Sequence, residues 1–195
     1  DYVAVATGGF HTVGLKNDGS LWAWGSNYAG QLGDGTRTSS TIPKQIDTDY
    51  VSAAAGFSHT VAIKRDGSLW AWGSNDAGEL GDGTTTNSLF PKQIDVGFSS
   101  VSAGIRYVVA LKDDGTLWSW GSNSSGQLGD GSTTNSLTPK QIGTGFSSVA
   151  AGNSHAVAIK GDGSLWAWGS NFAGQLGNGA TAQSSTPIQI GTGFS

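Results

Sequence analysis

The segment Leu-Trp-Ala-Trp-Gly-Ser-Asn occurs four times in the chain, each copy 48 residues after the last, with Ser replacing one Ala in the third copy. No insertion or deletion interrupts this spacing, so the 195 residues divide into four 48-residue repeats and three further residues. A fixed period of this length indicates one supersecondary unit that buries its faces against its own copies. We therefore expect a single repeat array, with units at 1–48, 49–96, 97–144 and 145–192, followed by 193–195.

Each repeat has the pattern of four short strands. In the second repeat, Asp66-Gly67 separates two apolar runs, which is a strong signal for a β-hairpin. Pro91 falls in the last run, where the edge strand of a sheet tolerates proline. No apolar spacing of 3.6 persists, and four short strands in about 48 residues predict the blade of an all-β propeller. The expected antiparallel strands of this repeat are 51–55, 60–64, 69–72 and 91–94.

Side-chain size predicts the order of the strands within a blade. The first run of each repeat is rich in Ala and Ser, which suits the crowded strand nearest the propeller axis. In the third run the two tryptophans occupy one face of the strand, and Leu and Ala occupy the other. We expect one face to pack on the preceding blade and the other on the following blade, with the tryptophans as structural residues. These are Trp22, Trp24, Trp70, Trp72, Trp118, Trp120, Trp166 and Trp168.

Composition argues against several classes of function. Without cysteine the chain has no disulfide, no thiolate metal site and no cysteine nucleophile. Charged residues make up 12% of the chain and the net charge is −4, so we expect no nucleic-acid partner. No apolar run approaches the roughly 18 residues of a membrane helix, so we expect no membrane insertion. The abundance of Ser, Thr, Asn and Gly favours a bacterial, extracellular protein, while the absence of thiols leaves the compartment open.

Three segments of the repeat together resemble a known family. In the second repeat, Gly56 is followed by His-Thr-Val-Ala-Ile at 59–63 and by Asp-Gly-Ser-Leu-Trp-Ala-Trp-Gly-Ser-Asn at 66–75, and the first repeat has Gly-Gln-Leu-Gly at 30–33. This combination resembles the bacterial-type regulator-of-chromosome-condensation repeat, and the resemblance covers all four copies. It implies a β-propeller, which in this family usually has seven blades. It leaves the function open, because the family includes a nucleotide exchange factor for a small GTPase, a plant ultraviolet receptor and a bacterial β-lactamase inhibitor.

The number of repeats raises the question of how the ring closes. Four blades of a seven-bladed ring cover little more than half of it, so the first and last blades would expose apolar faces that tend to associate. We expect either two chains joined into an eight-bladed ring, as a homodimer, or a chain that is part of a longer propeller. A closed four-bladed ring fits less well. The chain begins with Asp1 and not Met, which favours a processed or excised piece.

Three histidines recur at one position of the repeat. They are His11, His59 and His155, and Tyr107 takes this position in the third repeat. Evenly spaced histidines suggest a metal ring on the propeller axis. Tyr107 would replace a metal-binding histidine poorly. It would replace well a histidine whose ring is packed and forms a hydrogen bond. We therefore interpret the histidines as structural, each satisfying a local backbone group, and expect no metal or cofactor.

Two series of acidic residues fall in turns. Asp66 and its equivalents precede Gly in the hairpin, where Asp bonds its own backbone. Asp34, Asp82 and Asp130 lie in Gly-Asp-Gly, a setting that suits calcium, and Asn178 replaces the acid in the fourth repeat. Each loop offers one carboxylate, whereas calcium takes about six to eight oxygen ligands, so we favour the turn interpretation.

The residues that differ between repeats are the candidates for function. They fall in the loops after the first and third predicted strands, which share one end of every blade. They include aromatic residues and Arg, the favoured anchors of protein interfaces. We therefore predict a protein-binding face, with unconstrained drift at these positions as the alternative interpretation. The candidates are Phe10, Tyr28, Arg37, Phe57, Asp76, Ile105, Arg106 and Phe172.

Catalysis is not expected, because no Ser-His-Asp order or phosphate-binding loop stands out and the acidic residues fall in turns or loops. The sequence favours a non-enzymatic protein-binding or assembly module. Two alternatives stay open. A carbohydrate-binding propeller would need aromatic pockets repeated in every blade, whereas the candidate positions differ between blades. A regulator similar to the nucleotide exchange factor would act through loop insertions, which this fixed spacing lacks.

Overall fold

The computed structural model describes residues 1–194, which form sixteen β-strands and no helix. The strands build four sheets of four strands, and each sheet is a meander of consecutive antiparallel strands within one repeat. We number these sheets as blades 1 to 4. No helix in this part of the chain is long and apolar enough to cross a membrane. Blade 1 contains β1 (Tyr2–Thr7), β2 (His11–Lys16), β3 (Leu21–Gly25) and β4 (Ser40–Asp47); blade 2 contains β5 (Tyr50–Ala55), β6 (His59–Lys64), β7 (Leu69–Gly73) and β8 (Ser88–Asp95); blade 3 contains β9 (Phe98–Ala103), β10 (Tyr107–Lys112), β11 (Leu117–Gly121) and β12 (Ser136–Gly143); blade 4 contains β13 (Phe146–Ala151), β14 (His155–Lys160), β15 (Leu165–Gly169) and β16 (Ser184–Gly191).

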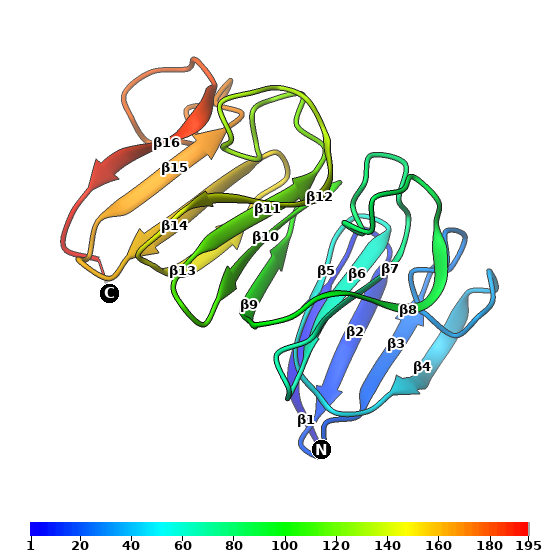
Figure 1. Ribbon diagram of the computed structural model, residues 1–195. Coiled ribbons are helices and arrows are strands. Elements are labelled where there is room, and N and C mark those ends of the chain that lie inside the picture. The colour runs from blue at the N-terminus through cyan, green and yellow to red at the C-terminus, as the bar shows by residue number, and fades with distance from the viewer. Residues whose placement is uncertain (195) are drawn as a thin grey trace.

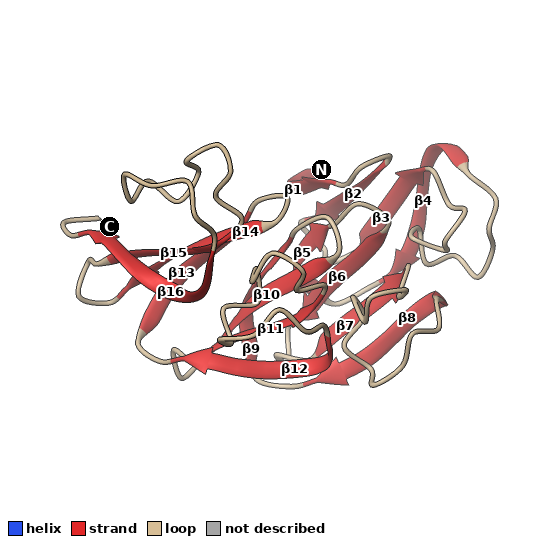
Figure 2. Cartoon of the chain, turned by 90° about the horizontal axis from the view of Figure 1, so that it is seen from above, coloured by secondary structure: helices blue, strands red, loops and turns tan. Residues whose placement is uncertain are grey.

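The four blades follow one another around a common inner edge. The first strand of each blade (β1, β5, β9 or β13) lies next to the first strand of the neighbouring blade. The last strand of each blade pairs only with the third and lies outermost (Figure 1, Figure 2). Small residues allow the close approach at the inner edge, as in the Ser-Ala-Ala-Ala segment that ends β5. The prediction of an all-β propeller with four-stranded blades is confirmed.

The strands of blade 2 begin and end within one residue of the predicted positions, except for its outermost strand, which is longer. This strand is Ser88–Asp95, whereas the proline-containing run predicted only 91–94. The extra length arises because Ser88 pairs with Gly73 after a shift in register next to Ala71. Pro91 lies within that shift and has no paired residue in β7, so its missing N–H costs the sheet no hydrogen bond.

The turn between the second and third strands is held by its Asp side chain. In blade 2, Asp66 Oδ1 accepts the backbone N–H of Ser68 at 2.9 Å and the hydroxyl of the same residue at 2.5 Å. Ser68 Oγ accepts the indole N–H of Trp70 at 2.8 Å. Gly67 has a φ of 77°, a left-handed conformation that glycine adopts without strain. The same bonds recur in the other blades, with Thr in place of Ser in blade 3.

Each pair of neighbouring blades encloses its own apolar core. One blade supplies aliphatic residues, and the next supplies a tryptophan from its third strand and an aromatic residue from its first strand. Full burial of a large apolar side chain stabilises a fold by about 1.5–3 kcal/mol. Both faces of a blade are used, as the alternation along the third strand predicted. The core between blades 2 and 3 contains Val61, Ile63, Leu69, Ala71 and Leu80 of blade 2 and Phe98, Val101, Val108, Ala110 and Trp120 of blade 3.

The two tryptophans of each repeat have different surroundings. Trp72, Trp120 and Trp168 are fully buried between blades. Each donates its indole N–H to a backbone carbonyl of the preceding blade, at 2.9–3.0 Å. Trp70 and its equivalents are only partly buried, and a lysine lies over each ring, as Lys64 Nζ does at 4.7 Å from the centroid of Trp70. The second tryptophan of each pair is therefore the one that fills the space between blades.

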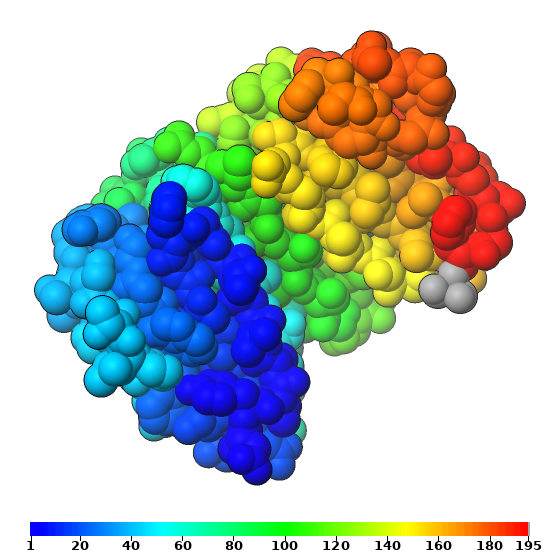
Figure 3. Space-filling model, turned by 180° about the vertical axis from the view of Figure 1, so that it is seen from behind, coloured from blue at the N-terminus to red at the C-terminus, as the bar shows by residue number. Residues whose placement is uncertain are grey.

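Blades 1 and 4 each have one face without a neighbouring blade in this chain. The two blades lie at opposite sides of the molecule, separated by blades 2 and 3 (Figure 3). On blade 1, Tyr2 is 44% exposed and Trp24, the equivalent of the buried Trp72, is only partly buried. On blade 4, Ile159 and Leu165 are partly exposed, although the equivalent residues of the other blades are buried. These two faces, which we call the end faces, expose apolar groups that the internal interfaces cover.

We expect loss of a tryptophan between two blades to be far more damaging than the same loss at an end face. Trp120→Ala removes a fully buried ring and leaves a cavity, which should lower the free energy of unfolding by about 3–5 kcal/mol. Trp24→Ala is the matched control and should lower it by less than half as much, because no blade covers Trp24. Urea unfolding followed by circular dichroism measures both values. Equal losses would contradict the role assigned to the buried tryptophan.

Candidate functional site

The loops after the first and third strands meet at one end of every blade. In blade 2 the backbone N–H of Ser74 donates to the carbonyl of Ser58 at 2.8 Å, and in blade 3 Ser122 donates to Arg106 at the same distance. Both sequence-variable loops therefore lie on the same end of the blade, as the direction of the strands predicted. The Asp-Gly hairpins lie at the opposite end. We call the end with the variable loops the variable face.

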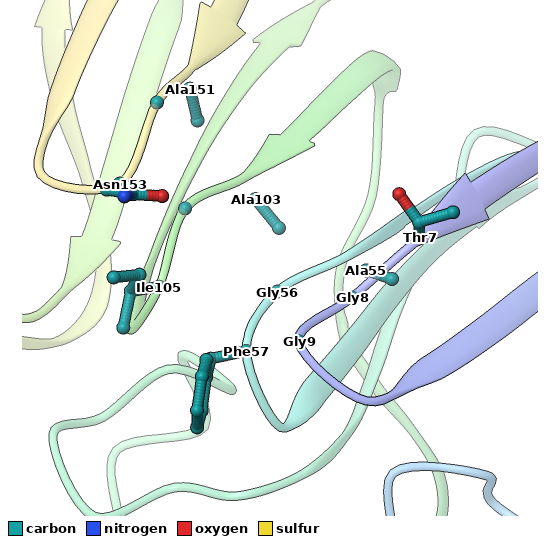
Figure 4. Close-up of a pocket in the computed structure, with 12 residues that line it drawn as sticks. Thr7, Gly8, Gly9, Ala55, Gly56, Phe57, Ala103, Ile105, Ala151 and Asn153 are labelled. Carbon is teal, nitrogen blue, oxygen red and sulfur yellow. The ribbon is translucent and has the colours of Figure 1, made fainter. Parts of the chain in front are cut away.

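A pocket of about 250 Å³ lies on the propeller axis, where the first strands end (Figure 4). All four blades line it, mostly with glycine, alanine and backbone atoms. Backbone hydrogen bonds join the loops from blade to blade, such as the N–H of Phe57 to the carbonyl of Ile105 at 3.2 Å and the N–H of Ile105 to the carbonyl of Asn153 at 3.1 Å. Because the lining residues include no titratable side chain, this pocket offers no acid or base.

A second cavity, of about 230 Å³, lies where the loops of blades 1, 2 and 3 converge on the variable face. It brings together five of the eight residues predicted to bind a protein, from three different repeats. Its wall combines aromatic and aliphatic groups with one carboxylate and one guanidinium from that set. We call it the loop cavity. The five residues are Tyr28, Phe57, Asp76, Ile105 and Arg106.

Two more of the predicted residues contact the wall of the loop cavity, and one lies elsewhere. Phe10 packs edge to face on Phe57, with ring centroids 5.4 Å apart. Arg37 donates to the backbone carbonyl of Tyr28 at 2.7 Å. Phe172 is 83% exposed and lies in blade 4, beside a different pocket. Seven of the eight residues therefore form one continuous surface over blades 1 to 3.

Glu79 also lines the loop cavity, and the sequence analysis missed it. Its side chain is fully buried, and this burial raises the pKa of the carboxyl above its usual value. Its Oε2 accepts the backbone N–H of Ala77 at 2.7 Å, whereas Oε1 has no hydrogen-bond partner among the described residues. The other three repeats have Gln at this position. That single change in the otherwise constant Gly-Gln-Leu-Gly segment was the signal that could have revealed the residue.

The prediction that each histidine satisfies a local backbone group is wrong for His11 and His59, because among residues 1–194 no ring nitrogen of either bonds a backbone group. His11 Nε2 lies 2.9 Å from Thr60 Oγ1 of blade 2. Thr60 donates its one hydroxyl hydrogen to the carbonyl of Gln31, so the hydrogen in the first bond belongs to His11 Nε2. His59 is fully buried, and within residues 1–194 neither ring nitrogen finds a partner. The ring requires the glycine before it, since a Cβ on Gly56 would lie 2.1 Å from His59 Cε1.

The residues of the following blade account for the difference between these histidines. In blade 3 the position of Thr60 is taken by Val108, which has no hydroxyl to offer His59. Tyr107 has a longer side chain, and its hydroxyl reaches two backbone carbonyls of blade 4. His155 is in the last blade, where no further blade of this chain covers it, and it is only partly buried. His11 and Tyr107 therefore form hydrogen bonds to the following blade, with a partner that the next repeat supplies.

The carboxylate of each Gly-Asp-Gly loop is engaged by groups of its own blade. Asp82 accepts the side-chain amide of Asn75 at 3.1 Å, and Lys92 Nζ lies 2.5 Å from its Oδ2. Burial alone would raise the pKa of Asp82, but its hydrogen bonds, above all the one from Lys92, lower it to about 2. Blades 1 and 3 repeat this ion pair, while the fourth repeat replaces both partners, with Asn178 and Ile188. In the described part of the chain, no group of three or more His, Asp or Glu side chains is placed to hold a metal ion.

These observations define the chain as a β-propeller that presents variable loops on a constant frame. A profile of the RCC1-like domain matches residues 1–195, over the whole sequence. The chain therefore belongs to the RCC1-like domain family, and the resemblance seen in the repeat motif is confirmed. The human and mouse E3 ubiquitin-protein ligase HERC2 are 43% identical to it over 44 residues, which are 23% of this chain and 1% of HERC2.

Solved propellers match the fold along nearly the entire chain. Human WBSCR16 superimposes with a TM-score of 0.90 at 25% identity, covering 98% of this chain and 53% of that one. Yeast RCC1 (Prp20), solved in complex with Kap60, superimposes with a TM-score of 0.89 at 25% identity, covering 98% and 49%. The chain thus spans about half the length of these propellers and a small part of HERC2.

We expect the buried histidines to make the fold sensitive to acid. Burial lowers the pKa of His59 to about 3 and that of His11 to about 4, whereas histidine in an unfolded chain titrates near 6.5. As the pH falls below about 6.5, the unfolded chain binds protons that the folded chain does not. The free energy of unfolding should then fall by up to about 1.4 kcal/mol per pH unit for each histidine, down to the folded pKa. His59→Phe keeps a ring beside Gly56 and should flatten this dependence.

The matched control is His155→Phe. Burial lowers the pKa of His155 as well, but this side chain is only partly buried, whereas that of His59 is fully buried. The control should leave most of the acid sensitivity in place. Urea unfolding at a series of pH values between about 7 and 4 measures both variants against the wild type. A His59→Phe protein with the same pH dependence as the wild type would show that His59 is not held neutral by its burial.

Proposed function

We propose that this protein is a non-enzymatic protein-binding module and that the variable face over blades 1 to 3 is its binding surface. The observation that carries the proposal is that exposed Phe10, Tyr28, Phe57 and Arg106 gather around one cavity, while the tryptophans and leucines that pack between the blades are the same in every repeat. Aromatic residues and Arg are the residue types that dominate binding energy at protein interfaces. Backbone hydrogen bonds between blades hold these loops, so the surface is largely formed before a partner arrives.

Likeness to a solved complex supports a protein as the partner. Yeast RCC1 (Prp20), half of whose length this chain matches, was crystallised in complex with the protein Kap60. A carbohydrate-binding propeller is less well supported, because the aromatic residues of the variable face belong to single repeats and form one cavity between three blades. The likeness to yeast RCC1 also keeps a role as a regulator of a GTPase as our second candidate. Release of a fluorescent guanine nucleotide from a small GTPase distinguishes that candidate from simple binding.

The binding proposal predicts the behaviour of a triple variant. Phe10→Ala, Tyr28→Ala and Arg106→Ala together remove three exposed anchors. Each anchor is worth about 1–2 kcal/mol at an interface, so the affinity for a partner should fall by about 100-fold or more. The partner is first captured from an extract of the source organism with the tagged wild-type chain. Its affinity for each variant is then measured by biolayer interferometry, and circular dichroism confirms that each variant is folded.

The control for this experiment lies on the opposite end of the blades. Arg65→Ala with Asp113→Ala changes two exposed charges beside the Asp-Gly hairpins and should leave the affinity unchanged. If the triple variant bound as tightly as the wild type, the variable face would not be the binding surface. If the hairpin variant lost binding instead, the partner would occupy the other end of the propeller.

We also propose that the end faces of blades 1 and 4 complete the ring by pairing with each other between two copies of the chain, unless further repeats of a longer chain cover them. The internal interfaces supply the pattern. Trp24 would donate to the carbonyl of Gln175 of the second copy, as Trp72 donates to Gln31. His155 would meet Thr12 of the second copy, as His11 meets Thr60.

Solution mass tests this pairing. Multi-angle light scattering should give a homodimer for the wild type, and Leu165→Arg, which places a charge on the end face of blade 4, should shift it to monomer. Val96→Arg is the control, because Val96 is exposed in the turn between blades 2 and 3, away from both end faces. A wild-type chain that stays monomeric at all concentrations would rule out the second copy and leave the longer chain as the source of the missing blades.

A further inference from the structure

The second repeat differs from the other three in its acidic residues at the loop cavity. Glu79 stands where the other repeats have glutamine, and Asp76 stands where they have Tyr, Ser and Phe. The two residues are three positions apart in one loop, and both line the same cavity. Repeat 2 therefore places two carboxylates at a point where the remaining blades have none.

The glutamine of the other repeats shows what the glutamate lacks. Gln31 Oε1 accepts the backbone N–H of Ala29 at 2.9 Å, and its Nε2 donates to Ser26 Oγ at 3.2 Å. Glu79 keeps the first of these bonds, to Ala77, but its Oε1 has no donor to replace the second. A fully buried carboxylate with one empty oxygen weakens the folded state of the free protein. Such a group is stabilised by a ligand that brings a hydrogen-bond donor and a positive charge.

The walls of the cavity define which cation would fit. Tyr28, Phe57 and Ile105 supply aromatic and aliphatic surface to the same cavity that Glu79 lines. A lysine side chain combines an apolar stem with a compact charge at its tip, and an ammonium near an aromatic ring is attracted to its face. Because Oε2 of Glu79 is already engaged, one oxygen is free, which suits the single point of an ammonium better than the two-pronged guanidinium of arginine.

We propose that the loop cavity binds a lysine side chain of the protein partner, with its ammonium near the Asp76 carboxylate and with Glu79 Oε1, which is buried in the free protein, turning to accept a hydrogen bond from it. This inference rests on the proposed protein-binding function and adds the chemistry of the partner residue. The apolar stem lies against Phe57 and Ile105. The exposed Arg106, which belongs to no ion pair within 4.0 Å among the described residues, lies at the same cavity and repels the incoming ammonium. Its guanidinium is left to pair with an acidic residue beside the lysine of the partner.

A structural role for Glu79 is the competing explanation. A protonated Glu79 would carry a hydrogen on Oε1 and would resemble glutamine, with Ser74 in the position of the serine that accepts from Gln31. In that case the cavity would have no preference for a cation, and Glu79→Gln would change no binding property. The Gln variant is suited to the test because three of the four repeats already fold with glutamine at this position.

The test uses n-butylammonium chloride as a mimic of the lysine side chain, with n-butanol as the uncharged equivalent and n-propylguanidinium as the mimic of arginine. Each is titrated into the ¹⁵N-labelled full chain at neutral pH and constant ionic strength, and the amide shift of Ala77 is followed by NMR. We expect saturable, millimolar binding of n-butylammonium to the wild type, weaker binding of n-propylguanidinium and none of n-butanol. Glu79→Gln should weaken the binding of n-butylammonium by about tenfold or more.

Two further variants separate the cavity from the charge alone. Arg106→Ala should strengthen binding of n-butylammonium, because a competing positive charge is removed. Gln127→Glu puts a carboxylate at the same position of repeat 3, away from the loop cavity, and should create no binding in a Glu79→Gln background. Equal affinity of the wild type and Glu79→Gln, or equal affinity for butanol and butylammonium, would overturn the proposal.

Failure of the proposed lysine site can be distinguished from failure of the proposed protein-binding function. If the captured partner binds Glu79→Gln as tightly as the wild type, while the triple variant of the variable face has lost binding, the surface is correct and the lysine site is wrong. If the partner loses affinity for Glu79→Gln and for the triple variant alike, the binding surface and the lysine site are both supported. If the partner binds the triple variant normally, the binding surface itself is wrong, and the lysine site falls with it as a site for that partner.

Discussion

The indole ring buried between successive blades is the interaction on which the rest of the structure depends. A sheet with apolar groups on both faces cannot exist alone in water. In this chain one tryptophan from each of blades 2, 3 and 4 covers the preceding blade and donates its indole N–H to a backbone carbonyl there. The same contact fixes where the loops of adjacent blades meet. The loop cavity thus follows from packing between blades, although the residues that line it take no part in the cores.

This division explains how the chain keeps a constant frame and a variable surface. Positions inside the interfaces tolerate little change, because a lost ring leaves a cavity and an added methyl group has no space. The loops at the variable face are held by backbone hydrogen bonds and by an asparagine common to all four repeats, such as Asn75, so their other positions are free to change. The position held by Phe57 in the second repeat is therefore held by Ile105 in the third and by Asn153 in the fourth, without loss of the fold. Function can diverge there while the propeller is preserved.

Several features were predictable from particular residues. The Asp66-Gly67 pair gave the hairpin, the period of 48 gave the repeat unit, and the alternation of Trp with Leu and Ala gave the two packed faces. The partner of His11 was not predictable, because Thr60 lies in the next repeat. The ion pair of Asp82 with Lys92 was missed as well, although the joint loss of acid and lysine in the fourth repeat is visible in the sequence.

The sequence by itself determined the number of blades, the strands within each blade and the set of positions free to vary, because all of these follow from local periodicity and from comparison of the repeats. The tertiary structure decided which variable positions meet. Phe10, Tyr28, Phe57, Ile105 and Arg106 come from three repeats and converge only because the blades splay around an axis. It also decided that Oε1 of Glu79 lacks a hydrogen-bond partner among the described residues. That property depends on the distance to every neighbouring donor, and distances between segments remote in the sequence are set by packing alone.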